Sequence, residues 1–129
     1  MLLTKAHRFL LGVLRETGWM RRDQLLPLMR LYDPAKVQSH CEAILRHLRY
    51  AGELIPMDDG LICLAELRGK GVDHAMLCAL DILLSLASGP PIQLTSRVPP
   101  YKLCFLLERE GGRIDAFAVL PVEPGRESI

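Results

Sequence analysis

The residues that could do chemistry are spread along the chain without a catalytic arrangement. Asp115 is followed in the chain by Glu123, and paired carboxylates beside strands hold Mg²⁺ in many metal-dependent nucleases. The Lys that would complete an E-x-K pattern and stabilise the attacking hydroxide is absent, because Pro124 and Gly125 follow Glu123. We therefore expect a protein that is not an enzyme.

Histidine and cysteine form no ligand pattern either. His7, His40, His47 and His74 contain no H-E-x-x-H pair, so surface or helix-capping roles are expected. The four cysteines lie in apolar segments and form no C-x-x-C pair, which favours buried reduced thiols over a zinc site. They are Cys41, Cys63, Cys78 and Cys104. We expect no metal, no cofactor and no small-molecule substrate.

Charge is distributed unevenly between the two halves of the chain. The net charge is +1, yet residues 1–50 hold nine Lys and Arg against four Asp and Glu, and residues 51–129 hold seven against eleven. This asymmetry fits an anionic partner at one end. It equally fits two halves that attract each other, or a head-to-tail dimer.

The elements that would position these residues begin with three helices. The first is predicted over residues 3–17, where apolar residues recur on one side and Gly18 follows. Trp19 and Met20 are expected to form a short connection. Asp23 is expected to cap the second helix. Asp33-Pro34 predicts the start of a third helix over residues 34–51, because Asp caps free N–H groups and Pro suits the first helical position.

A hairpin is predicted directly after the third helix. Asp59-Gly60 separates the apolar runs 53–57 and 61–64, a pattern typical of a tight turn between two strands. Three helices followed by a hairpin is the order of a winged helix-turn-helix, which we expect over residues 1–70.

The rest of the chain predicts one helix and a small antiparallel sheet in residues 71–122, followed by a tail at 123–129. The helix, over residues 73–88, is apolar on almost every side, which favours a central core helix or a homodimer interface. Asp81 interrupts it and is expected at an exposed edge or paired with Arg97 or Arg113. Strands are predicted over 101–108 and 113–120 around Gly111-Gly112, with an edge strand over 92–95. The fold class is therefore α+β.

No apolar run reaches the roughly 18 residues of a membrane span, and the first residues lack the features of a signal peptide. We expect a cytoplasmic protein without a membrane-bound part.

The exposed side of the third helix is the main candidate for function. In a helix-turn-helix the recognition helix enters the major groove of double-stranded DNA, and its outward residues meet bases and phosphates. The candidate contacts are Arg21, Arg22, Lys36, Gln38, Ser39, His40, Arg46, Arg49 and Tyr50. The alternative is a solvated face, or a protein–protein interaction module that uses the winged helix as a scaffold. The acidic wing tip Asp58-Asp59 favours that alternative, because it would repel a DNA backbone.

The chain resembles the small relatives of the replication-relaxation family, winged-helix proteins of bacterial plasmids and integrated mobile elements. The resemblance lies in residues 21–31, in ILRHLRYAGELIPMDDGLICLAELRGKG, in the apolar helix 73–88 and in the ending YKLCFLLEREGGRIDAFAVLPVEPGRE. Longer members carry a further nuclease-like region, which this chain does not complete. The resemblance implies DNA binding in the replication, transfer or regulation of a mobile element.

Overall fold

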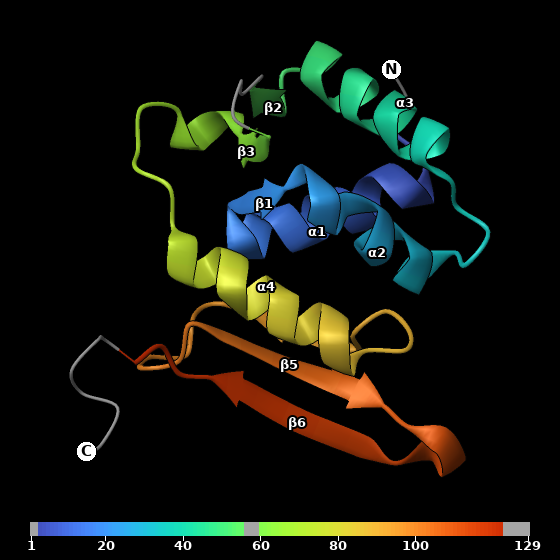
Figure 1. Cartoon of the computed structure of the whole chain (residues 1–129), viewed down its shortest axis with the longest axis vertical. Helices are drawn as coiled ribbons and strands as arrows, with labels where there is room; N and C mark the ends of the chain where they lie inside the picture. Colours follow the sequence, from blue (N-terminus) through green and yellow to red (C-terminus); the bar gives the residue numbers. More distant parts are fainter. Residues whose placement is uncertain (1–2, 56–59, 123–129) are drawn as a thin grey trace.

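The computed structural model describes residues 3–55 and 60–122. Within them, the chain forms four α-helices and two antiparallel three-stranded sheets, so the predicted α+β class is confirmed (Figure 1). The expected wing tip at Asp58-Asp59 and the expected tail lie outside the described residues.

Helix α1, Lys5–Thr17, is closed at its start by a reciprocal cap. The side chain of Thr4 accepts a hydrogen bond from the backbone N–H of His7 at 3.3 Å, and Nδ1 of His7 accepts one from the N–H of Thr4 at 3.2 Å. His7 takes the place that Glu or Gln has in the usual capping box. The predicted capping role is confirmed for His7, although the residue is buried rather than at the surface.

The connection expected at Trp19 and Met20 is instead a strand. β1, Trp19–Arg21, pairs antiparallel with β3, Leu61–Leu64, and β3 also pairs with β2, Leu54–Ile55. The sheet order β1-β3-β2 places the predicted hairpin beside the strand that leads into the second helix. A short 3₁₀ turn, Ala65–Leu67, follows β3.

Helix α2, Arg22–Tyr32, starts directly after β1 and contains Pro27 just beyond its first turn. Helix α3, Gln38–Tyr50, begins four residues later than Asp33-Pro34 predicts. The carboxylate of Asp33 accepts a hydrogen bond from the N–H of Ala35 at 3.0 Å, so it closes a turn between the two helices. Val37, in an extended conformation, then precedes α3.

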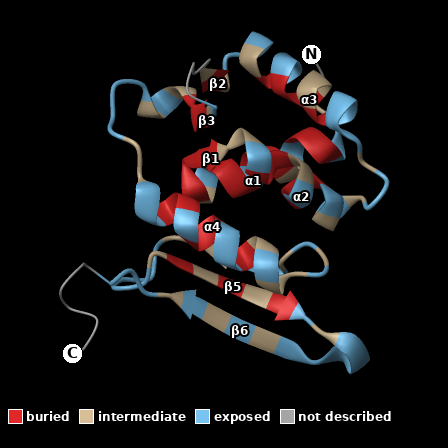
Figure 2. Cartoon of the chain, in the orientation of Figure 1, coloured by how far each residue is buried: buried red, intermediate tan, exposed pale blue. Residues whose placement is uncertain are grey.

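Helix α4, His74–Leu86, lies between two halves of the molecule: α1, α2, α3 and the first sheet form one half, and the second sheet forms the other (Figures 1 and 2). Asp73 caps it as expected, with Oδ1 accepting from the N–H of Met76 at 3.0 Å. One buried side faces α1, α2 and β1, and another faces the second sheet, so α4 is the predicted central core helix. Its remaining strip is exposed and includes Cys78 and Ile82.

The second sheet has the order β4-β5-β6. β4, Gln93–Thr95, is the predicted short edge strand, β5 is Leu103–Glu108, and β6 is Ile114–Val119. A 3₁₀ turn, Glu110–Gly112, connects β5 to β6 at the predicted pair of glycines.

One hydrophobic cluster runs through both halves. It joins buried residues of α1, α2, α3, the first sheet, α4 and β5, including Leu14, Leu45, Leu80 and Leu103, all with no exposed surface. The two halves therefore share a core. Among the described residues, no helix is both long and apolar enough to cross a membrane.

Candidate nucleic-acid interface

Helix α3 is held to the protein along one side only. Its buried residues are Cys41, Ile44, Leu45 and Leu48, the stripe that the spacing predicts. The opposite side is exposed along its length, as Figure 2 shows, and ends in Tyr50, whose side chain is 88 % exposed. A helix exposed in this way can present its outer side chains to a ligand.

The first turn of α3 carries the predicted base-contacting residues. Gln38, Ser39 and His40 are all exposed there. The sequence predicts Lys36 inside this helix, but α3 begins at Gln38, so Lys36 lies two residues before it. Its backbone oxygen accepts a hydrogen bond from Nε of Arg30 at 3.0 Å, which fixes the end of α2 against the start of α3.

Three predicted phosphate contacts have no ion pair with a carboxylate in the part of the chain that the structure describes. Arg46 is exposed near the middle of the outer side of α3, and Arg49 is half-buried one turn further on. Lys36 is half-buried at the other end of the helix. These three positive charges are therefore not neutralised by the described carboxylates.

Arg21 is placed differently from the expectation of a free phosphate contact. Its Nε lies 3.0 Å from Oδ1 of Asp23, and its NH2 lies 2.7 Å from Oδ1 of Asp81 on α4. The hydrogen bond to Asp81 is the main reason why the pKa of Arg21 is raised above its usual value. Its positive charge is thus already balanced by two carboxylates.

Arg22 and Gln38 share one carboxylate, that of Glu42 on the flank of α3. NH1 of Arg22 lies 3.3 Å from Oε2 of Glu42, and Nε2 of Gln38 donates to Oε1 at 2.9 Å. Glu42 therefore ties the start of α2 to α3 and fixes the orientation of the Gln38 amide.

A pair of stacked histidine rings joins α1 to α3. Nε2 of His7 lies 3.1 Å from Nδ1 of His47, and the ring centroids are 5.3 Å apart. Because Nδ1 of His7 accepts from Thr4, the neutral ring carries its proton on Nε2 and donates it to His47. Burial, then the positive potential of His47 and Lys36, lowers the pKa of His7.

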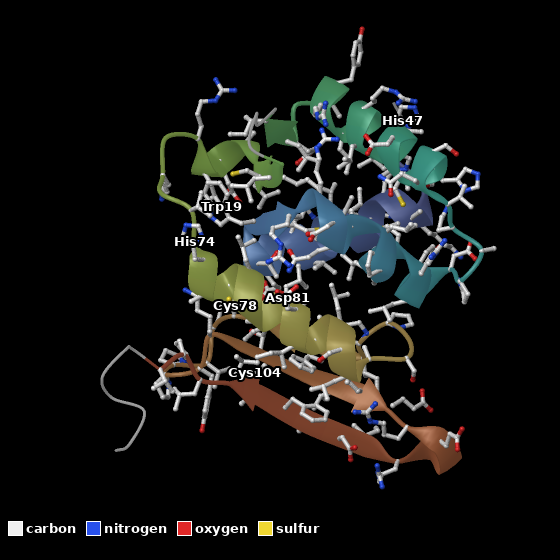
Figure 3. The ribbon with its side chains drawn as sticks, viewed as in Figure 1. Trp19, His47, His74, Cys78, Asp81 and Cys104 are labelled. Carbon is white, nitrogen blue, oxygen red and sulfur yellow. The ribbon has the colours of Figure 1, made fainter. Side chains whose placement is uncertain are left out.

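Sequence reasoning missed the contact of Asp81 on α4 with the end of β1 and the start of α2. Asp81, labelled on α4 in Figure 3, is half-exposed, as expected, but its partners are Arg21 and Gln24 rather than Arg97 or Arg113. Partial burial would raise the pKa of Asp81, yet the hydrogen bonds from Arg21 and Gln24 outweigh it and lower the pKa. The residues involved are far apart in the chain, so no local pattern indicates the pairing.

The remaining chemical candidates form no site among the described residues. Oδ2 of Asp115 lies 3.2 Å from Nε of Arg109 and 3.1 Å from NH2 of Arg113, and Glu123 lies outside the described residues. Cys41 and Cys63 are buried, and burial raises the pKa of both thiols. The expectation of burial is wrong for the two others, Cys78, which is exposed, and Cys104, which is half-buried (Figure 3). Residues 3–55 and 60–122 hold no group of three potential metal ligands.

A hollow of about 490 Å³ lies between the end of α1, the turn after β3, the start of α4 and residues 96–102. Two of its polar contacts are internal: Glu16 accepts a hydrogen bond from the N–H of Ser96, and Lys102 forms an ion pair with Asp73. No buried side-chain nitrogen or oxygen of the described chain lacks a hydrogen-bond partner. Arg15 and Glu66 also line the hollow, and neither side chain forms a hydrogen bond or ion pair with the described residues.

Comparison with models of known protein families, with curated proteins and with solved structures finds no match to this chain.

Proposed function

We propose that this protein binds double-stranded DNA through the outer side of α3 and has no catalytic activity. The observation that carries this proposal is that α3 packs along a single stripe while its opposite side stays open and is flanked by Lys36, Arg46 and Arg49. A helix supported from behind in this way has the shape that fits a major groove.

Lys36, Arg46 and Arg49, which form no ion pair with the described carboxylates, would contact phosphates. At about 1.5 Å per residue, α3 is ~20 Å long, so Lys36 at one end and Arg49 at the other can reach different stretches of the DNA backbone. Arg21 and Arg22 are weaker candidates, because each would first have to leave its carboxylate partner.

Base edges would be met by the first turn of α3. Gln38, Ser39 and His40 offer amide, hydroxyl and imidazole groups, the types that pair with bases. Tyr50 at the far end would place its phenol against a sugar or phosphate. The ion pair of Arg22 with Glu42 orients the Gln38 amide before any DNA arrives.

The resemblance to the replication-relaxation family supports the same class of function. It suggests a cytoplasmic regulator of replication or transcription encoded on a bacterial plasmid or mobile element.

A protein–protein interaction module is the second candidate. Tyr50 at the end of α3 is 88 % exposed and Val37, just before its start, is 43 % exposed, and aromatic and apolar groups of this kind are common at the centres of protein interfaces. The acidic pair Asp58-Asp59, expected from the sequence to be a wing tip and lying outside the described residues, favours the same alternative.

A salt titration separates the two candidates. With three phosphate contacts, the logarithm of affinity for a short random duplex should fall with a slope of about −2.7, so a roughly fourfold rise in salt should weaken binding about 40-fold. Fluorescence anisotropy measures this directly. Absence of binding at low salt, or binding insensitive to salt, would contradict the proposal and favour the protein-binding alternative.

A further inference from the structure

The feature that carries a further inference is β6, the edge strand of the second sheet. β6 pairs with β5 along its whole length, from Ile114 opposite Glu108 to Val119 opposite Leu103. No strand of the described residues pairs with its other side. Edge strands are usually protected by Pro, by a bulge or by charged side chains, whereas Ile114–Val119 contains no Pro, pairs with β5 in an unbroken register and carries one charge, Asp115.

The hydrogen bonds to β5 show which backbone groups of β6 are left over. The N–H of Arg109 donates to the oxygen of Arg113 at 2.6 Å, so Arg113 belongs to the residues whose backbone groups point toward β5. Hydrogen-bonded positions alternate along an antiparallel pair. Ile114, Ala116 and Ala118 therefore direct their N–H and C=O groups away from β5, at the open edge.

The side chains of the same three residues lie on the face of the sheet that α4 does not cover. Ile114 is 56 % exposed, Ala116 and Ala118 are exposed, and Leu120, just after the strand, is 53 % exposed. The one charged residue of β6, Asp115, points to the other face, where Arg109 and Arg113 hold it. The residues whose backbone groups face the open edge are thus uncharged and apolar.

We propose that β6 is a homodimer interface, at which the β6 strands of two copies pair antiparallel about a two-fold axis at Phe117. In this register Ile114 lies opposite the partner's Leu120, and Ala116 lies opposite the partner's Ala118. Each pair occurs twice, once on either side of the axis, as an isologous interface requires. Ile114, Ala116, Ala118 and Leu120 have outward backbone groups and side chains on one face, so these positions of the two strands can exchange hydrogen bonds.

Charge and shape favour a second copy as the occupant. In this register Asp115 lies opposite the partner's Val119, so the two Asp115 carboxylates are not opposed across the strands. The two most exposed apolar side chains at the edge cover each other. The pairing joins two three-stranded sheets into one sheet with both α4 helices on the same side.

The exposed strip of α4 is less suited to the homodimer that its apolar sequence predicts. Ile82, at 41 %, is the one large apolar residue of α4 in the exposed class, Leu84 and Leu86 are half-buried, and the half-exposed Asp81 beside Ile82 is bound to Arg21. The β6 interface therefore replaces α4 as the dimerisation surface. It makes no use of α3, and its test does not depend on DNA binding.

The decisive variant is Ala116→Pro. Proline removes the outward N–H and fits an edge strand whose N–H faces solvent, so the pairing with β5 should be retained. The wild-type chain should be a dimer in analytical ultracentrifugation. The variant should raise the dimer dissociation constant about 100-fold, because two interfacial hydrogen bonds are lost and the rings obstruct the partner. Far-UV circular dichroism and the melting temperature of the dissociated chain should be unchanged.

Two further measurements keep the test informative if Ala116→Pro disturbs the fold. Ile114→Lys should weaken the dimer at least tenfold without affecting the core, whereas Ile82→Lys on α4 should leave it intact. The amides of Ala116 and Ala118 should exchange hydrogen more slowly as protein concentration rises. A monomeric wild type, or a dimer broken by Ile82→Lys and unaffected by Ile114→Lys, would overturn the proposal.

Discussion

The amide of Gln24 joins three elements of the molecule. Its Oε1 accepts from the N–H of Arg21 at 2.9 Å, and its Nε2 donates to the backbone oxygen of Leu77 at 2.9 Å and to Asp81 at 2.7 Å. The side chain is only 2 % exposed, so water cannot replace these partners. Gln24 therefore fixes the start of α2 against α4.

Replacing Gln24 by Leu should destabilise the protein by about 1–3 kcal/mol, because the N–H of Arg21 would be left without its acceptor. Urea unfolding followed by circular dichroism measures the change. Gln93→Leu is the matched control: this exposed residue of β4 should change the free energy of unfolding by less than about 0.5 kcal/mol. Equal effects of the two substitutions would contradict the role of Gln24.

His7 should make the protein less stable in mild acid. Its pKa is lowered in the folded state, first by burial, so between the folded pKa and the ordinary value of 6.5 the unfolded chain holds a proton that the folded chain lacks. The contribution of His7 to the free energy of unfolding is therefore constant above pH 6.5, and it falls as the pH decreases from 6.5 toward the lowered pKa of the folded state. The slope for one proton is at most about 1.4 kcal/mol per pH unit.

The comparison of His7→Asn with His74→Asn tests this prediction. Unfolding free energies measured from neutral to mildly acidic pH should depend less on pH in His7→Asn than in the wild type. His74→Asn replaces an exposed histidine and should leave the pH dependence of the unfolding free energy as it is in the wild type. A wild-type profile that is retained in His7→Asn would show that His7 is not the group responsible.

At the scale of elements, α1 has one glycine within it and one directly after it, and the two have opposite roles. Gly12 is exposed within the helix, and a Cβ added there would meet no atom within 4 Å. Gly18 ends the helix with a φ of 77°, and its added Cβ would lie 2.6 Å from Cδ1 of Leu67. Only the second glycine is required by the fold.

Gly12→Ala should therefore stabilise the protein by about 0.5–1 kcal/mol, because alanine loses less freedom in a helix. Gly18→Ala should destabilise it by about 1–2 kcal/mol or more, because the left-handed conformation is strained for a residue with a Cβ. Thermal unfolding should show a higher melting temperature for Gly12→Ala and a lower one for Gly18→Ala. Shifts of the same sign would contradict the assigned helix end.

Elements defined by local chemistry are predictable from the sequence. The cap at Asp73 and the turn at Gly111-Gly112 depend on residues a few positions apart, and both occur as expected. Asp33 misled the prediction because its carboxylate can close a turn as well as cap a helix. β1 was missed because its three residues become a strand only by pairing with β3.

The candidate interface was predictable in outline only. The buried stripe of α3 follows from its spacing, which also identifies the open side. The ion pairs that neutralise Arg21 and Arg22 could not be predicted, because Arg21 and Asp81 are 60 positions apart and meet only when α4 packs against β1 and α2.

At the scale of the whole molecule, the two proposed surfaces lie at opposite ends. α3 lies at one end, β6 at the other, and α4 between them (Figure 1). Substitutions at β6 should therefore leave the contacts of α3 with a duplex intact, and substitutions at α3 should leave the dimer intact. The proposed DNA-binding and dimerisation functions are separable by mutation.

The central claim is that unpaired cations around α3 contact DNA phosphates. The most direct measurement is the salt dependence of duplex binding by Arg46→Ala and Arg97→Ala. Each variant removes one exposed arginine, but only Arg46 lies on α3. Arg46→Ala should reduce the magnitude of the slope by about 0.9, and Arg97→Ala should leave it unchanged. Equal slopes for the two variants would contradict DNA binding by α3.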